Sequence, residues 1–163
     1  GDWSSDVCSS DLASLDHLEK LLAAAKTHSL PLCLHVNEPV GHRYPGKYDP
    51  NLRGLYDLLS KNPEVPIILS HWGGGLIFYE LMPEVSKSLA HCYYDTAASP
   101  FIYSDAIYRI APFMVSPGKI LFGSDFPLIG FRRYFDAIDR EYGDVELKAD
   151  VLGKNAARLL KII

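Results

Sequence analysis

The fold can be read outward from the stretch Ile120-Leu121-Phe122-Gly123-Ser124-Asp125-Phe126-Pro127. Its apolar run stops at a small residue, presents the carboxylate of Asp125 and is broken by proline. This pattern predicts a buried strand that delivers one acid to its carboxyl end. A strand that is apolar on both faces is typical of a parallel sheet covered by helices, and catalytic groups in such sheets gather where strands end and loops begin.

The order of one strand followed by one helix is expected four times along the chain. Expected strands cover residues 30–36, 66–71 and 92–96 and the run that begins at Ile120. Apolar residues at helical spacing predict helices over 13–27, 52–61, 76–89, 104–114, 132–141 and 147–160, with an N-cap at Ser14 and an interruption near Pro83. This α/β alternation predicts a parallel sheet with right-handed crossovers. Two architectures fit it: a complete doubly wound sheet, or half of an eight-stranded barrel of about 250 residues.

Composition narrows the class of partner. A net charge of -4 leaves no basic surface suited to nucleic acid, and no apolar run reaches the roughly 20 residues of a membrane helix. The expected partner is therefore a small molecule, with the oligomeric state of the parent protein left open. Cys33 and Cys92 lie inside apolar runs and are expected to behave as small hydrophobic residues, which favours a reducing, cytoplasmic setting.

The first twelve residues follow no helix or strand pattern and are set apart from the fold. Reverse translation of Asp2 to Asp11 can give a common short-read sequencing adapter. We therefore expect residues 1–12 to be translated adapter and residues 13–163 to be native protein whose true amino terminus is missing. Such a junction favours the half barrel over the complete sheet.

The ends of the four expected strands carry groups that suit a divalent metal. Three strands end in His35, His71 and Asp125, and the other ends in Asp95. Imidazole and carboxylate together are typical ligands of zinc and similar ions, and strand ends are rigid enough to hold them in place. One histidine at a strand end is more often structural, but matching positions on successive strands favour a shared site.

These residues carry a family resemblance over 13–163. The run 32–35, the turn His71-Trp72-Gly73-Gly74, the segment Gly123-Ser124-Asp125-Phe126-Pro127 and the helix with Gly153-Lys154-Asn155-Ala156-Ala157 resemble the carboxyl-terminal half of the amidohydrolase superfamily. More narrowly, they are similar to the amidohydrolase-related (amidohydrolase 2) branch, which includes relatives of aminocarboxymuconate-semialdehyde decarboxylase. The resemblance implies a metal-dependent (β/α)8 TIM barrel in which the four strands are the fifth to the eighth.

The resemblance also implies roles for the strand-end residues. His35, His71 and Asp125 would bind a divalent metal, with zinc expected; His71 would bind it or orient the attacking water, and Asp125 would accept a proton. A divalent ion lowers the pKa of bound water, and a neighbouring carboxylate or imidazole moves its proton. The family's first-strand pair of ligands has no counterpart in this chain, so we expect the chain alone to be inactive although its parent is an enzyme.

Two further segments leave alternatives open. The loop after the first strand carries Glu38, His42, Arg43 and Lys47, which could bind an anionic substrate or could form a solvated loop. In the third strand only alternate residues face the barrel, and the sequence does not decide whether Tyr93 and Asp95 or Tyr94 point inward.

Three readings of function compete. The first is metal-dependent hydrolysis of a small cyclic or ester-like substrate, and the second is nonoxidative decarboxylation on the same scaffold. The third is a binding module in which the turn at Trp72-Gly73-Gly74-Gly75 cradles phosphate, although it lacks the glycine spacing of known phosphate loops. A half barrel would also expose strand edges and inner apolar side chains, which predicts aggregation or pairing of halves.

Overall fold

A four-stranded parallel sheet forms the centre of the computed structural model, which describes residues 15–41, 43–44 and 47–162. The strands are β1 (Leu32–Leu34), β2 (Ile67–Leu69), β3 (Cys92–Asp95) and β4 (Ile120–Leu121), and they pair in chain order. A doubly wound sheet reverses its strand order at a switch point, whereas a barrel adds each strand beside the last. The uninterrupted order β1-β2-β3-β4 is therefore that of a barrel half, as predicted.

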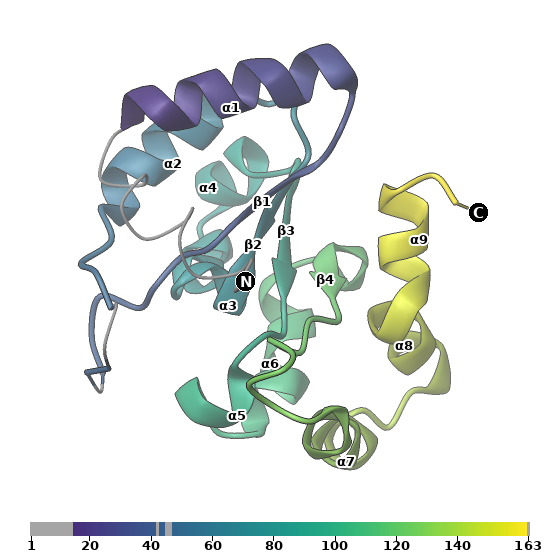
Figure 1. Cartoon of the computed structure of the whole chain (residues 1–163). Helices are drawn as coiled ribbons and strands as arrows, with labels where there is room; N and C mark the ends of the chain where they lie inside the picture. The colour runs from purple at the N-terminus through teal and green to yellow at the C-terminus, as the bar shows by residue number, and fades with distance from the viewer. Residues whose placement is uncertain (1–14, 42, 45–46, 163) are drawn as a thin grey trace.

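Helical segments connect the strands in the predicted alternation (Figure 1). They are α1 (Leu15–His28), α2 (Leu52–Ser60), α3 (Ser70–Gly73), η1 (Leu76–Leu81), α4 (Pro83–Ser88), α5 (Ser99–Ile102), α6 (Ala106–Met114), η2 (Pro117–Lys119), α7 (Phe131–Glu141), α8 (Val145–Ala149), η3 (Asp150–Lys154) and α9 (Asn155–Leu159). None of them, within the described ranges, has the length and apolar character needed to cross a membrane.

Two predicted helices are divided in the structure. The helix expected over 76–89 is a 3-10 segment, η1, followed by α4, because Pro83 lacks an N–H and begins a new helix at its first turn. The helix expected over 147–160 begins at Val145, where the Asp144 side chain caps it, and contains a π-helical turn, η3, before α9. The cap expected at Ser14 lies outside the described residues.

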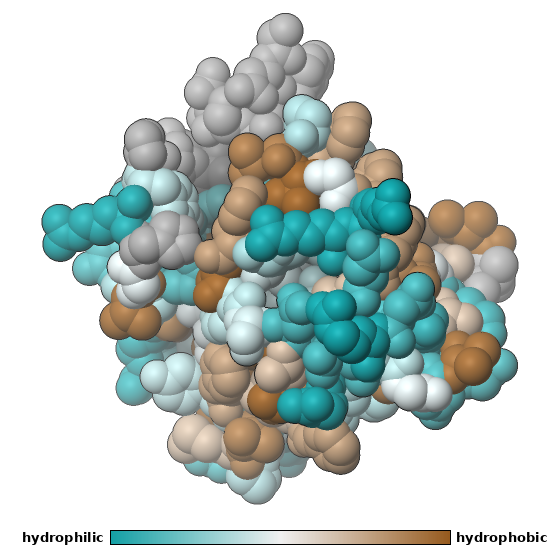
Figure 2. Space-filling model, turned by 90° about the horizontal axis from the view of Figure 1, so that it is seen from below, coloured by the Kyte–Doolittle hydropathy of each residue, from teal (hydrophilic) through white to brown (hydrophobic). Residues whose placement is uncertain are grey.

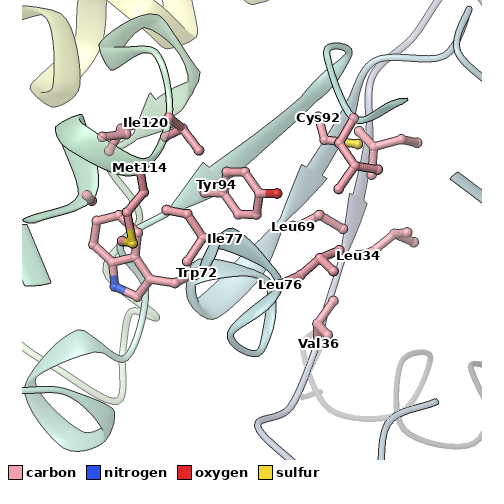
Figure 3. Close-up of a cluster of buried hydrophobic side chains, with 14 of the residues drawn as sticks. Leu34, Val36, Leu69, Trp72, Leu76, Ile77, Cys92, Tyr94, Met114 and Ile120 are labelled. Atoms are coloured by element: carbon pink, nitrogen blue, oxygen red, sulfur yellow. The ribbon is translucent and has the colours of Figure 1, made fainter. Parts of the chain in front are cut away.

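One face of the sheet packs against helices and forms the core (Figure 3). The register places Leu34, Leu69, Tyr94 and Ile120 at the same level of the four strands, and all four are buried. Trp72 is fully buried beside this layer. Side chains alternate between the faces of a strand, so this register also settles which residues point the other way.

The opposite face is the more open one. Cys33, Ile68 and Tyr93 lie at one level of it; Cys33 is exposed and the other two are half-buried. This face would line the interior of a closed barrel. Cys33 therefore lies outside the core although its run is apolar, because the apolar residues beside it in sequence point to the covered face.

A charged pair is buried on the covered side of the sheet. The ammonium of Lys119 donates to both oxygens of Glu80 at 2.6 Å, and the Tyr94 hydroxyl donates to the same carboxylate at 2.7 Å. The Glu80 side chain is fully buried and that of Lys119 is 13% exposed. Because a buried charge is costly unless paired, these contacts tie η1 to the segment that leads into β4.

The carboxyl ends of the strands point down in Figure 1, toward α5 and α7. Seen from below, hydrophilic side chains gather across the middle of this end, and apolar side chains lie around them (Figure 2). The carboxyl ends of the strands therefore lie at a polar rim.

The openness of the inner face can be tested by alkylation. We expect iodoacetamide to modify Cys33 in the native chain and to leave Cys92 unmodified until the chain unfolds. Cys92 is buried, and burial raises the pKa of its thiol to about 12, so almost no reactive thiolate is present. Peptide mapping by mass spectrometry measures both sites, and protection of Cys33 in the native monomer would show that its face is covered.

Candidate active site

Parallel pairing brings the chemistry-bearing residues to one rim. Leu34, Leu69 and Tyr94 lie at one level, so the residues that follow them, His35, Ser70 and Asp95, come next on the open face. The Ser70 hydroxyl contacts Cys33 Sγ at 3.4 Å and donates to Asp95 at 2.9 Å, which confirms that these side chains share a face. Of the two alternatives for β3, Tyr93 and Asp95 face inward and Tyr94 faces the helices.

The two predicted histidines lie in contact. The ring centroids of His35 and His71 are 4.7 Å apart, with the ring planes at 67°. His35 Nε2 is 2.7 Å from Asn37 Oδ1, which also accepts a hydrogen bond from the Tyr44 hydroxyl at 2.8 Å. A hydrogen bond from one ring nitrogen to a neighbouring group fixes the orientation of an imidazole ring, so Asn37 orients the ring of His35.

A left-handed turn presents His71. The residues from His71 to Gly75 have φ angles of 60°, 57°, 66°, 59° and 92°, so α3 and the residues after it turn in the left-handed sense. His71 and Trp72 are not glycine, and this conformation costs such residues about 1–2 kcal/mol each. Backbone strain of this type is typical of functional sites, where the surrounding structure must hold it.

Close contacts hold that turn from two sides. A Cβ added at Gly74 would lie 2.3 Å from the backbone oxygen of Asn37, and one at Gly73 would lie 2.9 Å from the Tyr94 ring. The Trp72 indole N–H donates to Ser99 Oγ at 2.8 Å. The backbone N–H groups of Gly74 and Gly75 donate within the turn to His71 and Trp72, an arrangement that gives the phosphate-cradle reading no support.

Asp95 supports His71 from the neighbouring strand. Its Oδ1 accepts hydrogen bonds from the backbone N–H of His71 at 2.9 Å and of Ala97 at 3.0 Å, in addition to the bond from Ser70. Burial raises the pKa of this carboxyl, the three hydrogen bonds oppose the rise, and the charge of Asp125 adds to it. Asp95 thus holds the His71 backbone in place, a role that its position at a strand end did not predict.

Asp125 reaches the rim through a loop tied to β3. Thr96 Oγ1 accepts from the Gly123 N–H at 3.1 Å and donates to the Gly123 oxygen at 2.8 Å. A Cβ at Gly123 would lie 3.1 Å from Asp95 Cγ, which is tighter than an ordinary van der Waals contact, so the loop packs closely against Asp95. Asp125 itself has a φ of 57°, a second strained position at this rim.

The electrostatics of the rim keep His71 neutral. Burial lowers the pKa of His71 first, and the neighbouring His35 lowers it further, while the charges of Asp125 and Glu38 act against both. A neutral imidazole is the form that binds a metal.

The donor set fits half of a divalent metal site. Two imidazoles lie together, and Asp125 is near enough to influence the pKa of His71. Within residues 15–41, 43–44 and 47–162, however, no three His, Cys, Asp or Glu side chains form a group that could hold a metal ion. The trio His35, His71 and Asp125 is therefore only partly assembled, and its joint role as a metal site stays a prediction.

The predicted substrate-binding residues divide between two hollows. Glu38 and Lys47 line a cavity of about 410 Å³ beside Gly74 and Gly75. Arg43 lines a neighbouring hollow of about 530 Å³, which Lys47 also reaches. His42 lies outside the described residues.

Comparison with known proteins was made by sequence and by structure. A family model described as amidohydrolase matches residues 6–162, and a search of curated proteins found no significant match. The family match begins within residues 1–12, so the boundary expected at residue 12 stays a prediction.

Three solved structures show the same fold. They are 5-carboxyvanillate decarboxylase from Sphingomonas paucimobilis (TM-score 0.69, 18% identity, covering 89% of this chain and 53% of that one), dihydroxybenzoic acid decarboxylase from Polaromonas with bound manganese (0.69, 16%, 90% and 54%) and an uncharacterised TIM-barrel protein from Bordetella bronchiseptica (0.66, 17%, 98% and 54%). The chain thus spans about half the length of the structures that it matches, and its fold is a partial TIM barrel.

The contact between the left-handed turn and Asn37 can be tested by substitution. Gly74→Ala adds a methyl group where no space exists, in a conformation that disfavours alanine, and we expect it to lower the free energy of unfolding by about 2–5 kcal/mol. Gly41→Ala is the matched control, because Gly41 also has a positive φ but has nothing within 4 Å of an added Cβ. We expect Gly41→Ala to lower the free energy of unfolding by about 1 kcal/mol. Urea unfolding measures both, and equal effects would contradict the close packing of the turn.

Proposed function

Because the chain belongs to the amidohydrolase family, we propose that it forms the metal-binding carboxyl half of a (β/α)8-barrel enzyme. The observation that carries the proposal is the pair of imidazoles, His35 and His71, in contact at the carboxyl rim of the sheet. In barrels of this type the active site is built at that rim.

The chain's own residues would divide the work. His35, oriented by Asn37, and His71, kept neutral by burial, would supply two nitrogen ligands. Asp125 would complete the donors from this half or hold a proton beside them, and Asp95 would keep the His71 backbone in place. A divalent ion bound there would supply Lewis acidity toward a substrate oxygen. The remaining ligands would come from the other half of the barrel.

The reaction proposed for the whole barrel is nonoxidative decarboxylation of a small carboxylate. Support comes from two of the similar structures, which are decarboxylases of 5-carboxyvanillate and dihydroxybenzoic acid. The second candidate is hydrolysis, since the amidohydrolase description of the family model and a carboxylate near His71 both suit activation of water. Manganese, present in one of those structures, and zinc are both candidate ions.

Metal binding by the chain itself tests the shared part of both candidates. We expect zinc or manganese to bind weakly, because two or three ligands hold an ion loosely, and His35→Ala or His71→Ala to weaken binding by about tenfold or more. His28→Ala, which removes an exposed histidine at the end of α1, should change nothing. Isothermal titration calorimetry gives the affinities.

Equal binding by the wild type and the two rim variants would overturn the proposed site. For the intact barrel, release of carbon dioxide from an aromatic carboxylate separates decarboxylation from hydrolysis, which would leave a hydrolytic product instead.

A further inference from the structure

The structure contains a buried carboxylate with one unpaired oxygen. Glu38 is 8% exposed, and its Oε1 is fully buried without a hydrogen-bond partner among residues 15–41, 43–44 and 47–162. A buried acceptor left unpaired costs about 1–3 kcal/mol, and more when it carries charge. No step proposed above uses this group.

Glu38 lines the 410 Å³ cavity, and the rest of that cavity is largely apolar and aromatic. Phe78 and Tyr103 flank Gly75, with their ring centroids 6.2 Å apart, and Leu52, Val40 and Tyr79 form other parts of the lining. A cavity of this size holds one small ring or a short aliphatic body. The cavity therefore combines a largely apolar lining with the acidic side chain of Glu38.

The nearest cation of the cavity lining is directed elsewhere. The Lys47 ammonium donates to the Val40 oxygen at 2.8 Å and lies 5.6 Å from the centroid of the Tyr44 ring. Burial raises the pKa of Tyr44, and the negative charges of Glu38 and Asp125 add to the rise. Burial and Glu38 together raise the pKa of Tyr103 to about 12, which keeps its hydroxyl protonated.

We infer that the Glu38 cavity binds the ammonium group of a small aromatic or apolar amine, with the Glu38 carboxylate as its counter-ion. A cation compensates a buried carboxylate better than a neutral donor does, and the faces of aromatic rings attract cations. The inference deepens the proposed function, because Gly74 and Gly75 of the cavity lining belong to the left-handed turn that presents His71. The inference rests on the proposed function only in assuming that the reacting group of the bound amine would lie at the histidine pair.

The test compares two ligands of one shape. Benzylamine is a cation at pH 7, and benzyl alcohol offers a neutral donor on the same ring. We expect the wild-type chain, without metal, to bind benzylamine about tenfold more tightly than benzyl alcohol. Nitrogen-15 NMR titration gives both affinities, and shifts of the Gly74 and Gly75 amides report binding in this cavity.

Two variants test whether the Glu38 carboxylate causes the preference for benzylamine over benzyl alcohol. Glu38→Gln keeps the shape and removes the charge, and we expect the preference to fall to within about twofold. Glu19→Gln makes the same change on the exposed side of α1 and should keep the full preference.

Equal or tighter binding of benzyl alcohol by the wild type would overturn the inference even if Glu38→Gln does not fold. A preference that survives Glu38→Gln, or amide shifts confined to other parts of the chain, would overturn it as well. No metal is added in this experiment, so a failure to prefer benzylamine would not count against the histidine metal site. In the same way, loss of metal binding in the histidine variants would not count against the amine site.

Discussion

The polar rim depends on the left-handed turn from His71 to Gly75. With this turn in place, the imidazole of His71 contacts that of His35 just after β1, with the ring centroids 4.7 Å apart. Two non-glycine residues pay about 1–2 kcal/mol each for that path. The strain is offset by the Asp95 bond to the His71 N–H, by the Trp72 bond to Ser99 and by the close approach of Gly74 to Asn37.

The contacts that hold the turn also link all four strands. Asn37 follows β1 and touches both His35 and the turn after β2, while Asp95 ends β3 and packs against Gly123 after β4. Each of these contacts is made by a residue at the end of a strand or just beyond it. The geometry of the candidate site is thus produced by the same hydrogen bonds that fix the strand ends, which is why backbone strain and polar side chains occur together here.

Much of the fold could be predicted from the sequence, because its signals are local. The apolar runs predicted all four strands, and their alternation with helices predicted a parallel sheet. The shared rim of His35, His71 and Asp95 followed from strand ends alone. The inward phase of Tyr93 and Asp95 could not be predicted, since β3 carries a tyrosine on each face and only the contacts of Asp95 with Ser70 and His71 decide it.

Other features of the structure could not be predicted, because they depend on contacts between segments that are far apart in the sequence. The exposure of Cys33 follows from which face the helices cover, and the unpaired Oε1 of Glu38 follows from the packing of a loop against two other segments. The buried pair of Lys119 and Glu80 makes the first three strands depend on the fourth. Glu80 and Tyr94 precede Lys119 in the sequence, so a piece of the chain that ends after β3 would hold an acid without its cation. Because a buried charge without its partner is costly, the burial of η1 and the docking of β4 are energetically coupled.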